Sequence, residues 1–282
     1  MGFFDQHGNP LANFYLLRGH EICPILNYSK PKKAVLGEYL YGGIYFRNFG
    51  HFLLETLARM HHIKSCRLPV ILISNGLNFD FKGWQRELLN LMDVDPDRFI
   101  FLNEPSRIES LHDCNPGFEL RNFFLPSLRK AIVIGGGFLG DRKKVWISRS
   151  KLPSSLSKIE GEIEIELLLK NKGWHIFHPE EYSIKDQIEC YSAASIVAGF
   201  EGSALHLIML VESPEFKLII FRRAEGNGLK SLNENYRVIG DRLGIVQRVY
   251  NVEMHYLSGE KRKRSFRLVR PKDVVDILDE IY

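Results

Sequence analysis

The sequence has few cysteines, and they lie far apart. Cys23, Cys66, Cys114 and Cys190 form no Cys-x-x-Cys pair, and no histidine stands at zinc-ligand spacing beside them. A disulfide-rich secreted scaffold and a zinc knuckle are therefore excluded. We expect reduced thiols and a cytoplasmic location.

Long apolar runs and a strong charge excess are also absent. No stretch reaches the roughly 18 to 20 apolar residues that a membrane span needs, and "MGFFDQHGNP" lacks the pattern of a signal peptide. Lys and Arg number 38 against 34 Asp and Glu, a net charge of +4. This balance suits a small anionic ligand, and we expect no nucleic-acid partner. For the basic run 259–267 we expect a solvated hairpin tip or a peripheral contact with an anionic membrane.

The second half of the 282-residue chain alternates between strand and helix patterns. Expected strands at 144–149, 174–179, 195–200 and 217–223 are separated by expected helices at 162–172, 183–194 and 203–211. This order predicts βαβ units and a Rossmann-like parallel sheet with helices on both faces. Gly173 marks the end of one helix, and Ser183 is placed to cap the start of the next.

The first half also has α/β character. Strand patterns at 32–43, 68–74 and 98–103 alternate with helix patterns at 49–63 and 83–94. The glycines between 135 and 140 predict a linker. We therefore expect two domains, 1–140 and 141–282, the second ending in a closing helix at 270–282.

A Glu-Gly-Ser turn follows the apolar strand 195–200. Glu201, Gly202 and Ser203 stand where a parallel sheet turns into a helix, and the amide groups of such a turn point at an anion. Glu201 would repel a diphosphate, so it fits sugar hydroxyls better. The alternative is an ordinary turn in which Ser203 caps a helix.

A basic cluster ends another strand of the same expected sheet. Ser148, Arg149 and Lys151 follow "KVWI", and Arg offers a planar fork for phosphate oxygens. Because both clusters follow strands of one parallel sheet, we expect them at the same edge. The alternative is a solvated basic loop.

His51 and Glu55 stand four residues apart in an expected helix. A carboxylate that binds an imidazole can hold its tautomer and strengthen it as a base. The alternative is a buried structural histidine with a surface glutamate. For His61, His62, His175 and His178 we expect structural or exposed positions.

Four segments, in this order, resemble the family 61 glycosyltransferases, which include bacterial capsular-polysaccharide enzymes. They are "YLYGGIYFRNFGHFLLETLARM" with its Asn-x-x-His, "KVWISRSK", the stretch 158–210 and "ENYRVIGDRLGI". The chain departs from the family pattern at Lys158 (Arg in the family), Gly161 (Asn), Glu201 (often His) and Leu207 (Asn).

The resemblance implies a GT-B-like α/β fold, in which two Rossmann-like domains with parallel sheets face a cleft. Domain 1–140 would bind the acceptor and supply the base, and domain 141–282 would bind the nucleotide sugar. The implied reaction is an inverting, metal-independent transfer to a hydroxyl of a glycan or lipid-linked acceptor in surface polysaccharide synthesis. The alternative is a non-catalytic nucleotide- or glycan-binding relative.

The roles are assigned as follows. His51 with Glu55 is the expected base, and Asn48 and Gly50 lie on the acceptor side. The expected donor residues are Ser148, Arg149, Lys151, Glu201, Gly202 and Ser203. We assign no metal site and no cofactor besides the donor, expect Glu162 and Glu164 merely at a helix surface, and leave the oligomeric state open.

Overall fold

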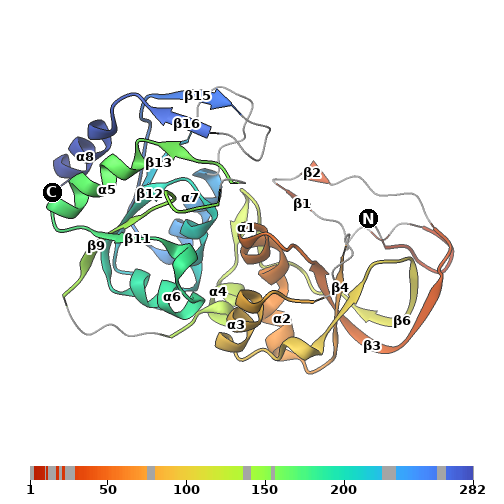
Figure 1. The fold of residues 1–282 in the computed structure, drawn as a ribbon. Coiled ribbons are helices and arrows are strands. Elements are labelled where there is room, and N and C mark those ends of the chain that lie inside the picture. The colour runs from red at the N-terminus through yellow and green to blue at the C-terminus, as the bar shows by residue number, and fades with distance from the viewer. Residues whose placement is uncertain are drawn as a thin grey trace. The chain divides into compact units, whose positions relative to one another are not determined.

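The computed structural model describes residues 3–9, 11, 17–18, 21–22, 29–74, 80–135, 141–153, 156–223, 233–258 and 265–281. The chain divides into two compact units, Met1–Ile134 and Gly135–Tyr282, where the sequence predicted a boundary at 140. Each unit is a mixed α/β structure with a parallel sheet (Figure 1), as predicted. Most of the glycine run, 136–140, and the basic residues 261–264 lie outside the described residues.

The C-terminal unit is built on a five-stranded parallel sheet. Its strands, in spatial order, are β11 (His175–Phe177), β9 (Lys143–Ile147), β12 (Ala194–Phe200), β13 (Lys217–Phe221) and β14 (Gln247–Tyr250). Numbered along the chain, this order is 2-1-3-4-5. The chain therefore reverses direction across the sheet between β9 and β12, and ligands of such sheets bind beyond the carboxyl ends of the strands at this switch point.

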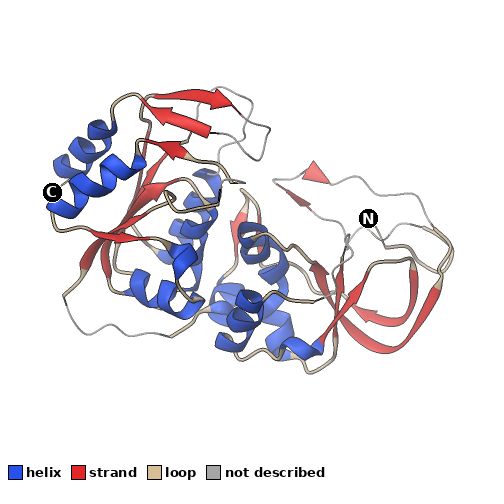
Figure 2. Cartoon of the chain, in the orientation of Figure 1, coloured by secondary structure: helices blue, strands red, loops and turns tan. Residues whose placement is uncertain are grey.

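Helices cover both faces of this sheet (Figure 2). They are α5 (Glu162–Asn171), α6 (Ile184–Ser192), the 3₁₀ helix η6 (Ser203–Leu210), α7 (Asn233–Leu243) and α8 (Pro271–Glu280). One face packs on α5 and α8 through a core that includes Trp146, Phe200 and Phe221. Val197 and Gly199 alternate with Ala198 and Phe200 along β12 and therefore face the other side of the sheet. All four residues are buried, so the strand is covered on both sides.

A small sheet and the last helix complete this unit. The small sheet consists of β10 (Ile159–Glu160), β16 (Ser265–Leu268) and β15 (Met254–Ser258), with β16 parallel to β10 and antiparallel to β15. Helix α8 packs against α5 (Figure 1). The predicted closing helix therefore belongs to the core of the C-terminal unit.

The N-terminal unit has a four-stranded parallel sheet. In spatial order its strands are β5 (Phe99–Leu102), β4 (Val70–Ile73), β3 (Lys33–Ile44) and β6 (Ser106–His112). The first part of β3 pairs with β6 and its last part with β4. The remaining short strands are paired as β1 (Leu17–Arg18) with β2 (Glu21–Ile22) and β7 (Phe118–Glu119) with β8 (Phe123–Phe124).

The helix predicted at 49–63 is not uniformly α-helical. It consists of α1 (Phe49–His51), a π-helical turn η2 (Phe52–Thr56), a 3₁₀ turn η3 (Leu57–Arg59) and α2 (Met60–Ser65). Thr56 ties the π turn to the end of β3, because its hydroxyl donates to Ile44 O and accepts from Phe46 N–H, each at 3.0 Å. The other helices of this unit are α3 (Gly83–Leu91), the 3₁₀ turn η4 (Pro96–Arg98) and α4 (Pro126–Ile132).

In the part of the chain that the structure describes, every helix is too short or too polar to span a bilayer.

Candidate functional site

Arg149 lies at the switch point of the C-terminal sheet, two residues beyond the end of β9. Its side chain is held against the turn after β12, since a Cβ added to Gly202 would overlap Nη1 of Arg149. Nη2 donates to Ser157 O at 3.3 Å. Nε is buried and has no hydrogen-bond partner among the described residues. The structure thus brings together the two segments that the sequence placed at one sheet edge.

The charge of Arg149 is set by its surroundings. Burial and, after it, the positive charge of Arg223 lower the pKa of Arg149 to about 10, although the charge of Glu162 opposes both effects. A pKa of about 10 leaves the guanidinium positive at neutral pH. This desolvated cation can bind an anion more strongly than one in water could.

The turn after β12 is fixed by a tyrosine. The Gly202 N–H donates to the hydroxyl of Tyr236, which in turn donates to Gly202 O, both at 2.9 Å. The Gly202 amide that we expected to face an anion therefore has a partner within the chain. An anion could take this amide only by replacing the tyrosine hydroxyl.

The prediction that Ser203 caps an α-helix is wrong. The segment after the turn is the 3₁₀ helix η6, Gly202 occupies the position before it, and no side chain caps it. Ser203 itself is exposed. Its hydroxyl and amide remain predicted donor contacts.

Glu162 is a site residue that the sequence analysis missed, because we expected it at a helix surface. It is the first residue of α5 and is fully buried, and its Oε1 accepts a hydrogen bond from the Arg149 N–H at 3.0 Å. Oε2 has no partner among the described residues. Burial raises the pKa of the Glu162 carboxyl to about 7, although the hydrogen bond and charge of Arg149 oppose this shift.

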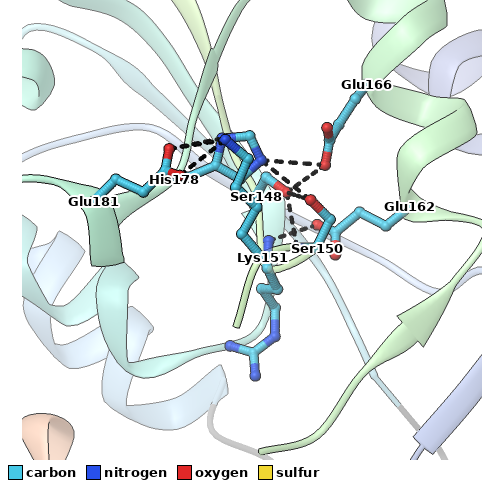
Figure 3. A network of polar contacts seen from close by, with 8 residues as sticks. Ser148, Ser150, Lys151, Glu162, Glu166, His178 and Glu181 are labelled. Carbon is cyan, nitrogen blue, oxygen red and sulfur yellow. Dashed lines mark hydrogen bonds and ion pairs between the residues drawn. The ribbon is translucent and has the colours of Figure 1, made fainter. Parts of the chain in front are cut away.

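A polar network of Ser148, Ser150, Glu166 and His178 lies just after β9 and β11 (Figure 3). The Ser148 hydroxyl donates to Glu166 Oε1 at 2.6 Å, and Ser150 Oγ lies 3.1 Å from Nε2 of His178. His178 is buried in this network, between Ser150 and Glu166. Ser148, which we predicted to bind the donor, is thus also buried and bonded within the protein.

Lys151 and Glu201 have different surroundings. Lys151 is exposed and forms an ion pair with Glu181, with Nζ 2.9 Å from a carboxylate oxygen. Glu201 is buried, and its Oε2 accepts from the Arg223 N–H at 3.4 Å. The charge of Glu201 also raises the pKa of Arg223 against the effect of burial, so this buried carboxylate has a cation close enough to interact with.

In the N-terminal unit, His51 and Glu55 are in contact, as their spacing predicted. Nδ1 of His51 bonds Oε2 of Glu55. The histidine side chain is 45% exposed and the glutamate 5%, the reverse of the structural alternative. Asn48 precedes α1 and is exposed, whereas Gly50 is buried inside that helix. The ring of His51 is therefore accessible while its partner is fixed.

Our expectation of metal independence assumed that the sequence has no Asp-x-Asp spacing, and this assumption is wrong. Asp93, Asp95 and Asp97 follow one another in "DVDPD". The Asp95 side chain accepts from the Asp97 N–H at 2.9 Å, and the Asp97 side chain bonds Arg86. Over the described ranges, no group of three or more His, Cys, Asp or Glu side chains is placed to hold a metal ion.

The family model described as "Glycosyltransferase 61" matches residues 49–219. The chain belongs to this family. The matched range runs from α1, with His51, to β13 and contains Arg149 and Gly202. A search of curated proteins finds no significant match.

Two of the departures from the glycosyltransferase 61 pattern have a structural explanation. Gly161 has φ +96°, a left-handed conformation that glycine and asparagine adopt most readily. A Cβ there would lie 2.9 Å from Pro271 Cγ of α8, so this chain requires glycine. Leu207 is fully buried in η6, where it contributes apolar packing instead of an amide.

Proposed function

We propose that the protein transfers a sugar from a nucleoside-diphosphate donor to a hydroxyl of a glycan or lipid-linked acceptor, with inversion and without a metal ion. One observation carries the proposal. The Arg149 guanidinium is positioned on the Gly202 turn at the switch point of a 2-1-3-4-5 sheet, with a buried Nε that has no partner among the described residues. Membership of the glycosyltransferase 61 family supports a nucleotide sugar as the ligand of this site.

The chemical demand of the reaction fits a fixed guanidinium. When the bond between the anomeric carbon and the diphosphate oxygen breaks, negative charge develops on the leaving diphosphate. A preorganised cation in a desolvated site stabilises that charge more than it stabilises the ground state. Arg149 supplies this cation, and the exposed Lys151 adds longer-range attraction. Glu201 is assigned to the hydroxyls of the donor sugar.

His51 is assigned as the base. With Nδ1–H donating to Glu55, Nε2 of the imidazole carries a lone pair that can take the proton of the acceptor hydroxyl as that oxygen attacks the anomeric carbon. The buried carboxylate of Glu55 stabilises the imidazolium that forms. Asn48 and Gly50 belong to the acceptor side in this proposal.

The finer architecture is part of the same proposal. A GT-B arrangement would let the N-terminal unit present acceptor and base to the donor held by the C-terminal unit. We place the activity in surface polysaccharide synthesis, on the cytoplasmic side.

The test uses the full-length protein with UDP-, GDP- and CDP-sugars, with and without EDTA. A nucleotide at about a hundredfold its dissociation constant should stabilise the fold by about 2.7 kcal/mol in a thermal-shift assay. Arg149→Ala should lose this stabilisation. His51→Ala should keep it and lose turnover, by roughly a hundredfold or more. The anomeric configuration of the product, read by NMR, checks inversion.

His255→Ala is the matched control, since His255 is an exposed histidine on β15. It should retain both binding and turnover. Near-normal turnover of His51→Ala would contradict the assignment of the base. Nucleotide binding without hydrolysis or transfer by the unmodified protein would instead favour a non-catalytic binding protein.

A further inference from the structure

A second arginine follows the strand next to the Gly202 turn. Arg223 comes two residues after the end of β13, and β13 pairs with β12 up to the register Phe200–Phe221. Its backbone N–H donates to Glu201. The backbone of Arg223 therefore lies next to the Gly202 turn. Arg149 approaches the same turn from β9, the strand on the other side of β12. Arg223 follows no motif that pointed to a site in the sequence, and the family match ends before it, at residue 219.

The charge of Arg223 acts on Arg149. The charge of Arg223 is the main electrostatic cause that lowers the pKa of Arg149, after burial. Burial likewise lowers the pKa of Arg223, against the charges of Glu201 and Glu162. Nε of Arg223, like that of Arg149, is buried without a hydrogen-bond partner in the described part of the chain.

Such an arrangement is costly for the empty protein. Two desolvated cations of the same sign disfavour each other, and buried donors without acceptors lose their bonds with water. An anion between the two side chains would remove both costs. Because one guanidinium binds one phosphate group through two parallel hydrogen bonds, two of them match a pair of linked phosphates.

We propose that Arg223 is the second arm of a diphosphate clamp: Arg149 binds one phosphate of the donor and Arg223 the adjacent one, so that the site selects diphosphate over monophosphate ligands. This inference rests on the proposed donor site at Arg149. It supports a nucleoside-diphosphate sugar as the donor with a residue, Arg223, that the proposed function does not use.

The test is isothermal titration of the full-length protein with inorganic pyrophosphate and, separately, inorganic phosphate. The unmodified protein should bind pyrophosphate more tightly than phosphate, by roughly tenfold or more. Arg223→Lys keeps the positive charge and most of the aliphatic side chain but loses the planar pair of N–H donors that binds a phosphate group. It should weaken pyrophosphate binding roughly tenfold and leave phosphate binding nearly unchanged, so that the preference disappears.

Two further variants separate the outcomes. Arg149→Lys should weaken the binding of both ligands. Arg237→Ala, which removes an exposed arginine paired with Asp241 on α7, should alter neither. Circular dichroism of each variant checks that it folds, and the two Lys substitutions keep the positive charge and the aliphatic part of the side chain.

The clamp is overturned if Arg149→Lys weakens pyrophosphate binding and Arg223→Lys does not, a result that leaves the proposed donor site intact. It is also overturned if Arg223→Lys weakens both ligands equally, because the arginine then acts only as a diffuse charge. If neither variant affects pyrophosphate binding, or if the unmodified protein binds none, the clamp fails and the anion site fails with it. The sugar-transfer assay with His51→Ala then decides the proposed function separately.

Discussion

Replacing Glu162 by glutamine should stabilise the protein at alkaline pH. Glu162 is fully buried, and its Oε2 has no hydrogen-bond partner among the described residues. Glutamine keeps an oxygen that can accept from the Arg149 N–H but carries no charge. The variant therefore retains the hydrogen bond from the Arg149 N–H and removes the cost of burying an ionised carboxylate.

The size of the effect follows from the pKa of Glu162. Burial raises this pKa from the ordinary 4.5 to about 7, so the folded protein holds a proton that the unfolded chain has already released. The cost of ionising Glu162 is absent below pH 4.5, grows as the pH rises, and is complete above about 7. The difference between the two pKa values corresponds to about 3 kcal/mol. Glu162→Gln should thus raise the free energy of unfolding by that amount at pH 8 and by almost nothing at pH 4.5.

Urea denaturation at several pH values measures the effect. Trp146 and Trp174 report on the C-terminal unit if Trp84, in the N-terminal unit, is first replaced by phenylalanine. Glu164→Gln is the matched control on the same helix, because Glu164 is exposed, and it should change stability little at any pH. Parallel stability curves for the Glu162→Gln variant and its parent between pH 5 and 8 would refute the reasoning. A second readout is pyrophosphate binding at pH 8, which should strengthen when the negative charge beside Arg149 is removed.

Two further substitutions test the site and its support. Gly202→Ala should displace the end of the Arg149 side chain and weaken pyrophosphate binding roughly tenfold, while the free energy of unfolding falls by less than about 1 kcal/mol. Gly173→Ala, at φ +77° with open space around it, should lower the free energy of unfolding by about 1 kcal/mol and leave pyrophosphate binding unchanged. Titration with pyrophosphate and urea denaturation distinguish the two variants. Thr56→Val removes two hydrogen bonds to part-buried backbone groups at the end of β3 and should cost about 2 kcal/mol in urea denaturation. Equal stability of the valine variant would show that these bonds contribute nothing to the fold.

Much of the C-terminal sheet could be predicted from local patterns. The apolar runs predict β9, β12 and β13, because a strand that is buried on both faces has apolar residues in succession and no alternation of polar with apolar residues. Ser183 caps α6 by accepting from the Asp186 N–H, and Gly173 ends the helix before it with a positive φ, both as predicted. These features depend on residues close together in the chain, which is why the sequence specifies them.

The rest depends on contacts between distant segments. The segment "EIEIELLL" has apolar residues on several sides, so its period could not decide which side is buried. In the structure Ile163 and Leu167 are exposed while Glu162 is buried. The partner of Gly202 is Tyr236, 34 residues further along the chain. No local pattern encodes that pairing, and it occupies the amide that we had expected to bind an anion.

At the proposed base, the contact between His51 and Glu55 was predicted correctly, whereas the type of helix was not. A spacing of four residues brings His51 to Glu55 in either an α- or a π-helical turn, so the contact could be predicted without knowing the helix type. The exposure of each side chain could not, because Glu55 is buried through packing of the whole N-terminal unit.

The π turn Phe52–Thr56 also limits how the sequence of this segment can vary in length. A π turn contains one residue more than the α turn that would occupy the same place. Deleting one residue between His51 and Glu55 would restore regular α-helical winding but shorten the spacing of this pair from four residues to three. His51 would then point along a different direction from the one Glu55 now fixes, so loss of one amino acid in this turn should be more damaging than most substitutions in it.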